Sequence, residues 1–244
     1  MNSIVVNTVI AAATIAMFLA ITGLMYVYAG RSRWRGFRSR AALLSVLVVW
    51  TVGAISIAWV SALQWLALAV ALPIIAATVW ALTPQGRIFL SVTPVHWLVA
   101  IQLYRVVGGL FLYAYYSDGR VSEPFALSAG WGDIATGLLA VPVAWMLWKR
   151  MRGSGWAFLA WTILGVVDLI VAPIMAFAYG ATALVAFPMS VIPMWLGPPL
   201  GNVLHILAAK AFFLQRRRSL EKGSPSVPSH ATRTTNQPAA SSAP

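Results

Sequence analysis

The sequence contains no cysteine among its 244 residues. This absence excludes disulfide bonds, thiolate metal sites and cysteine nucleophiles. Acidic residues are also scarce, five against 17 lysines and arginines, and only 9% of all residues are charged. A soluble domain carries roughly 25% charged residues, so this chain lacks the polar surface that a water-soluble monomer needs. We therefore expect the lipid bilayer to be its solvent.

Apolar residues are abundant where charged residues are few. They make up 60% of the chain, and many of its 12 tryptophans and 7 tyrosines lie near the ends of apolar runs, as interfacial anchors do. A net charge of +12 would suggest nucleic acid in a soluble protein, but here the basic residues fall in short loops between apolar runs. We therefore predict no nucleic-acid partner. The first apolar run lacks a basic segment before it, so we expect a retained helix rather than a signal peptide.

Apolar runs of about 20 residues, the length that crosses a bilayer as a helix, recur along the chain. The run from 41 to 82 has no charged residue and is about twice this length, so we divide it at a turn near Ser61–Gln64. Prolines interrupt the apolar stretch 181–199, which favours an outer-surface or re-entrant segment there. The sequence predicts an all-α, polytopic transmembrane helical bundle of about seven helices in residues 1–218 and a disordered cytoplasmic tail at 219–244. The predicted spans are about 4–29, 41–60, 63–82, 88–115, 125–148, 156–179 and 198–214.

The distribution of basic residues predicts the orientation of this bundle. The loops at 31–40, 83–87, 149–152 and 215–222 carry 13 lysines and arginines, whereas the loops between them carry only Arg120. Basic loops stay in the cytoplasm. We therefore expect the N-terminus outside and the C-terminus in the cytoplasm, in a bacterial cytoplasmic (inner) membrane.

A few polar residues lie within the predicted spans, where a charge costs about 2.5–3.5 kcal/mol and usually faces the bundle interior. Counted at about 1.5 Å per residue from the outer ends, the charged and histidine side chains lie roughly 12–16 Å deep. Because successive helices tend to be neighbours, a shared polar cluster is expected. Its candidate residues are Gln102, Arg105, Asp133, Asp168, Asn202 and His205.

Helical spacing predicts which faces turn inward. In the span 125–148 a stripe of small residues contains the carboxylate, and bulky residues suited to lipid occupy the opposite face. A second stripe in the span 88–115 is polar and aromatic. The small stripe is Ala126, Gly130, Asp133 and Gly137; the lipid face is Trp131, Ile134, Leu138, Val141 and Trp145; the polar stripe is Gln102, Arg105, Gly109, Tyr113 and Tyr116.

Arg105 stays charged and can form paired hydrogen bonds with a carboxylate. Either Asp133 or Asp168 can pair with it, and we expect the other to hold a proton, because an unpaired charge is costly away from water. His205 could share that proton. The cluster has two interpretations, a clamp that fixes helix packing or a polar site for a proton, ion or small ligand.

Enzymatic motifs are missing. The sequence has no HExxH, GxSxG or Walker pattern and no paired-histidine metal spacing, so no metal site, cofactor or catalytic residue is predicted. A haem between His96 and His205 would need histidines at one depth, and these two differ by about 15 Å. A single axial ligand at His205, in a membrane redox or enzyme protein, stays open.

Three stretches resemble a pattern in uncharacterised bacterial integral-membrane proteins. They are YRVVGG at 104–109, EPFALSAGWGD at 123–133 and the GxxD from Gly165 to Asp168. The resemblance covers the last four spans, about half of the chain, and implies a bacterial membrane setting without an activity.

The leading functional hypothesis is therefore solute, ion or proton handling at the polar cluster. The alternative is a non-catalytic structural or assembly subunit of a membrane complex. The expected partners are the lipid bilayer, a small solute, ion or proton, and a second copy of the chain or another membrane protein.

Overall fold

The computed structural model describes residues 66–119, 121–179 and 197–223, together with the single positions 5, 8, 12, 16, 52 and 53. Every element in these ranges is helical, and they contain no β-strand. The spans predicted at 4–29 and 41–60, the turn at 61–64, the segment 181–196 and the tail from 224 lie outside the described residues.

The first described helix, α3, runs from Leu66 to Leu82 and is followed at once by α4, Pro84–Val92. The sequence predicted that a helix ends before a loop at 83–87. The helix does end at Leu82, but no loop follows, because a new helix begins at Pro84. Thr83 is the N-cap of α4, its hydroxyl accepts a hydrogen bond from the Gly86 N–H at 3.1 Å, and Pro84 occupies the first helical position. Threonine followed by proline is a helix-start signal, and it begins a new helix here.

The region predicted as one span, 88–115, consists of four consecutive pieces. After α4 the chain breaks at Thr93 and Pro94 and continues as α5 (Val95–Ala100), the 3-10 helix η2 (Ile101–Gly108) and α6 (Gly109–Asp118). Proline lacks the N–H that a helix needs and disfavours the helical conformation in its predecessor, and Thr93 is extended here. The Gln215 side chain donates hydrogen bonds to two carbonyls freed at this break, Leu90 at 3.2 Å and Thr93 at 2.7 Å.

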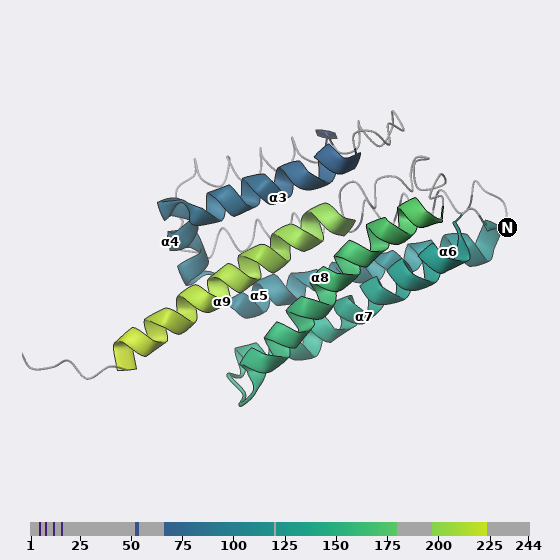
Figure 1. Cartoon of the computed structure of the whole chain (residues 1–244). Helices are drawn as coiled ribbons and strands as arrows, with labels where there is room; N and C mark the ends of the chain where they lie inside the picture. The colour runs from purple at the N-terminus through teal and green to yellow at the C-terminus, as the bar shows by residue number, and fades with distance from the viewer. Residues whose placement is uncertain are drawn as a thin grey trace, which may run out of the picture.

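The two following helices lie close to their predicted bounds. α7 runs from Glu123 to Trp148 and α8 from Ser154 to Ala178, against predicted spans of 125–148 and 156–179. A tight connection separates them, with Arg150 and Gly153 in the left-handed region at φ 51° and 85°. α7 packs along both α8 and η2 (Figure 1).

The last helix, α9, runs from Gly201 to Gly223 after a π-helical turn at 197–200. It lies between α3 on one side and α5 and α8 on the other, and its C-terminal end extends beyond its neighbours (Figure 1). The sequence predicted its end at 214, and the helix continues past that point. A run of charges ends the apolar span, but arginine, glutamate and lysine are good helix formers.

Three helical stretches within the described residues are long and apolar enough to cross a membrane: Val95–Ser117, Glu123–Trp148 and Ser154–Ala178. Their outward faces agree with a lipid environment. Trp131 and Trp145 on α7 and Ile163 on α8 are more than half exposed. Buried side chains of α5, α7, α8 and α9 pack together as an apolar core, which includes Phe158, Trp161 and Leu204.

Phe158 tests this packing. Its ring is fully buried and stacks on Phe212 of α9, with centroids 4.7 Å apart. Because lipid is as apolar as the core, only the cavity left by Phe158→Ala should contribute, about 2 kcal/mol. We expect a lower melting temperature in detergent. Ile163→Ala, at a 64% exposed position of the same helix, should change it little, and equal effects would contradict this packing.

Candidate functional site

Arg105 is carried by η2, and the 3-10 winding decides which residues share its face. Residues three apart eclipse in a 3-10 helix, so Gln102, Arg105 and Gly108 lie in line, and all three are buried. The stripe predicted with α-helical spacing was therefore wrong at its far end. Tyr116 is 72% exposed.

Asp133 is carried by α7 on the stripe of small residues. Ala126, Gly130, Asp133 and Gly137 are all buried. The residues predicted to face lipid are exposed, apart from Ile134, whose side chain is half-buried against α6. The small stripe lets η2 approach closely, since a side chain at Gly137 would lie 3.0 Å from the Val106 backbone nitrogen.

Three glycines clear the space that the polar side chains occupy. A Cβ at Gly108 would overlap the Asp133 carboxylate, one at Gly132 the Asp168 carboxylate, and one at Gly165 the ring of His205. The glycines thus belong to the polar cluster as much as the charged residues do. Alanine at any of them requires a polar side chain to move.

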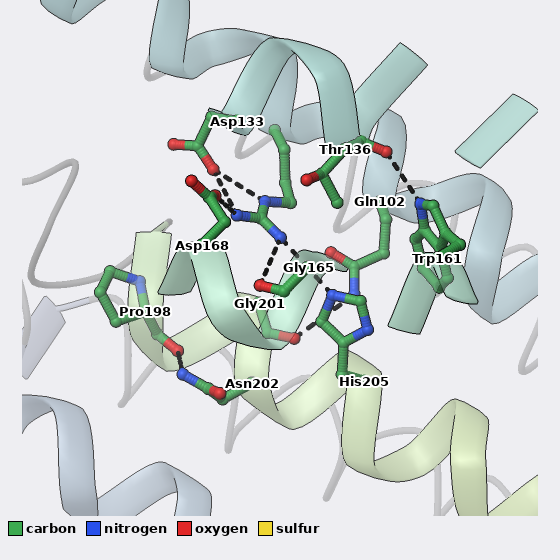
Figure 2. Close-up of polar contacts among 11 residues, drawn as sticks. Gln102, Asp133, Thr136, Trp161, Gly165, Asp168, Pro198, Gly201, Asn202 and His205 are labelled. Atoms are coloured by element: carbon green, nitrogen blue, oxygen red, sulfur yellow. Dashed lines mark hydrogen bonds and ion pairs between the residues drawn. The ribbon is translucent and has the colours of Figure 1, made fainter. Parts of the chain in front are cut away.

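The Arg105 guanidinium is the centre of the cluster (Figure 2). Its Nε donates to Asp133 Oδ1 at 2.7 Å, and Nη2 lies 2.7 Å from the same oxygen. Nη2 also donates to Asp168 Oδ2, and Nη1 donates to the Gly165 carbonyl at 3.3 Å. One buried guanidinium therefore joins η2, α7 and α8.

α9 is the fourth helix next to the guanidinium. His205 Nε2 lies 3.5 Å from Arg105 Nη1. Gln102 connects η2 to α9 one turn away, where its amide donates to the Gly201 carbonyl at 3.3 Å. Asn202, predicted as a cluster member, donates instead to the Pro198 carbonyl of its own segment at 2.7 Å.

The charges of the cluster do not balance. One guanidinium faces two carboxylates, which leaves a formal charge of −1 when both are ionised. The Arg105 side chain is 1% exposed, and those of Asp133 and Asp168 are 11% and 10% exposed. Such a charge, out of water, favours either a proton or a close counter-charge. No group of three or more His, Asp and Glu residues in the described ranges is placed to hold a metal ion.

Sequence reasoning missed two residues beside the cluster. The ring of Trp161 packs against that of His205 with centroids 4.7 Å apart, and its Nε1 donates to the Thr136 carbonyl at 2.9 Å. The sequence spacing could have identified Trp161. Trp161 precedes Gly165 by four residues and Asp168 by seven, so the three share one face of a helix.

Residues 62–213 match a domain of unknown function, DUF8737. This range is more than half of the chain and contains all the cluster residues. The chain belongs to the DUF8737 family. The matched DUF8737 range begins four residues before α3.

No curated protein and no solved structure matches the chain. Membership of DUF8737 identifies an uncharacterised family and brings no activity with it.

Arg105→Gln tests the charge balance. It leaves two buried carboxylates without a counter-charge, and we expect a loss of about 3–5 kcal/mol, because removing one partner of a buried pair leaves an uncompensated charge. Neutralising both carboxylates as well, with Asp133→Asn and Asp168→Asn, should recover most of the loss. The measurement is thermal unfolding in detergent. Arg87→Gln, at an exposed arginine, serves as the control, and additive effects of the three cluster substitutions would contradict this coupling.

Proposed function

We propose that this chain is a multi-pass membrane protein that binds and releases a proton at the cluster of Arg105, Asp133 and Asp168. The observation that carries the proposal is the excess of one carboxylate over the single guanidinium in a nearly closed site. A proton removes the excess negative charge. The neutral carboxyl group can still accept a hydrogen bond from Arg105.

The size and charge of the site favour a proton over an ion or a solute. Glycines bring the helices into contact around the polar groups. Within the described residues, two clefts lie away from the guanidinium, one beside Trp156 and Arg216 and one beside Leu139, Trp161 and Leu164. A metal cation would also meet the guanidinium charge. A proton needs no additional space.

The hydrogen bonds point to Asp168 as the residue that takes the proton. Asp133 Oδ1 faces both Nε and Nη2 of the guanidinium, whereas Asp168 receives one hydrogen bond, from Nη2. The carboxylate with more charged hydrogen bonds is better stabilised as an anion. Asp133 is then the permanent partner of Arg105 and Asp168 the group that changes its charge.

A second candidate function, a structural clamp, is favoured by a different observation. One guanidinium contacts groups on α7, α8 and α9, and glycines at the contacts fit the helices tightly around it. Buried ionic groups can specify one arrangement of helices without binding anything. In that case the protein is a structural or assembly subunit of a membrane complex, with both carboxylates always ionised.

The proposal includes seven spans in a bacterial cytoplasmic membrane, with the N-terminus outside. The positions of the loops support this orientation. The basic connection between α7 and α8 and the arginine-rich end of α9 lie at the same end of the bundle, and the connection between α6 and α7 lies at the other (Figure 1). Basic residues gathered at one end support the assignment of that end to the cytoplasmic side.

The orientation is testable because the chain has no cysteine of its own. We expect a membrane-impermeant maleimide to label Glu123→Cys in intact bacteria and Arg152→Cys only after the membrane is permeabilised. Both positions are exposed. The reverse pattern would contradict the orientation, and labelling of both in intact cells would contradict a membrane crossing by α7.

Infrared difference spectroscopy of the purified protein between acid and alkaline pH tests proton binding. We expect the C=O stretch of one protonated buried carboxyl group, absent in both Asp168→Asn and Asp133→Asn, because either substitution leaves one carboxylate for one guanidinium. Glu123→Gln should keep the band, since that carboxylate is exposed. A clamp predicts no such band in the native protein.

Transport is tested by the same variants. Proteoliposomes with a trapped pH dye should acidify in response to an imposed proton gradient, and this flux should disappear in a folded Asp168→Asn variant. Normal flux in a folded Asp133→Asn, Asp168→Asn protein would exclude the cluster as the proton site. A titrating carboxyl group without flux would indicate proton binding that serves regulation rather than transport.

A further inference from the structure

The contact between Arg105 and His205 determines where the histidine carries its proton. The guanidinium has only N–H donors, so a hydrogen bond between Arg105 Nη1 and His205 Nε2, which lie 3.5 Å apart, requires Nε2 to be the acceptor. A neutral imidazole that accepts at Nε2 carries its proton on Nδ1. Nδ1 is therefore a hydrogen-bond donor.

Five buried side-chain atoms in the described part of the chain have no hydrogen-bond partner, and this donor and two others come from side chains beside the charged cluster. These three are His205 Nδ1, Gln102 Oε1 and Thr136 Oγ1. Their residues are 2%, 0% and 0% exposed. Buried polar atoms are nearly always paired with protein or with ordered water, so three of them in one region require an explanation.

The three atoms belong to neighbouring side chains from three different helices. Trp161 contacts two of the residues, through its ring to His205 and through Nε1 to the backbone of Thr136. The third residue, Gln102, bonds to Gly201, which precedes His205 by one helical turn. Figure 2 shows Gln102, Thr136 and His205 gathered on the Trp161 side of the guanidinium.

We propose that His205, Gln102 and Thr136 form a second polar site, next to the charged cluster, that binds water. The site offers one donor at Nδ1, one acceptor at Oε1 and a hydroxyl that can do either. This set matches a neutral molecule that both donates and accepts hydrogen bonds. Arg105 on one side disfavours a cation, and Asp133 and Asp168 beyond it disfavour an anion.

This water site is independent of the proposed proton binding. It requires only the Nδ1–H form of His205 and the three unpaired atoms, and it holds equally if the charged cluster is a clamp. A water molecule at this site would supply hydrogen bonds to the three polar atoms, which the apolar ring of Trp161 cannot do.

Nitrogen NMR of histidine-labelled protein in lipid bilayers tests the site directly. The chain has three histidines, so His96→Gln with His230→Gln leaves His205 as the single labelled residue. We expect the neutral form protonated at Nδ1, with magnetisation passing from water to that proton. The Nε2-protonated form, or an Nδ1 proton that receives no signal from water, would overturn the proposal.

Thr136→Val gives a second measurement, because it removes the hydroxyl and keeps the shape of the side chain. If water bridges the site, the variant should lose a hydrogen-bond partner and its melting temperature should fall by about 2–4 °C. If the site is dry, the variant removes an unpaired buried hydroxyl and should be as stable or more stable.

Thr162→Val is the matched control. Its hydroxyl is also buried without a partner in the described residues, but Thr162 lies about 100° around α8 from Trp161, at the side of the face that meets the cluster. We expect no fall in its melting temperature. An equal fall in both variants would assign the effect to the general loss of a threonine and overturn the proposal.

Discussion

The arrangement of η2, α7, α8 and α9 depends on a guanidinium that is surrounded on all sides. Arg105 is 1% exposed and bonds to two carboxylates and a backbone carbonyl, with His205 beside it. A charged group in an apolar bundle must have such partners, since each missing one leaves an uncompensated charge. The helices therefore cannot shift independently without breaking the environment of one side chain. The glycines opposite the polar groups follow from the same requirement, because the helices must come close enough for short side chains to reach Arg105.

The excess carboxylate gives this arrangement a choice of charge states that a matched ion pair lacks. With Asp133 held by two guanidinium nitrogens and Asp168 by one, the two acidic residues are not equivalent even though both touch Arg105. The difference arises from geometry alone, since the residue type is the same. In the proposed function, the proton therefore joins the cluster at one defined position, Asp168, without separating the helices.

Sequence reasoning predicted the long, uninterrupted helices well, because hydropathy and length are strong signals over 20 or more residues. α7 and α8 lie within two residues of their predicted bounds. It failed in the region before them, where the chain breaks at Thr93 and Pro94, winds as a 3-10 helix from Ile101 to Gly108, and begins a helix at Pro84 inside a predicted loop. Four of the six candidate residues meet around the guanidinium and Gln102 lies one turn away, whereas Asn202 bonds locally. Periodicity gives the face of a helix, but it cannot tell whether an amide turns toward its own backbone or toward a neighbour.

The 3-10 winding of η2 also sets the level of Arg105 in the bundle. A 3-10 helix rises about 2.0 Å per residue and an α-helix about 1.5 Å, so the eight residues of η2 are about 4 Å longer than the same residues wound as an α-helix. Rewinding would also turn Gln102 and Gly108 off the line that they share with Arg105. The pitch of η2 thus determines its register with α7, and any change of pitch would move the positive charge of Arg105 along the axis of η2 relative to α7.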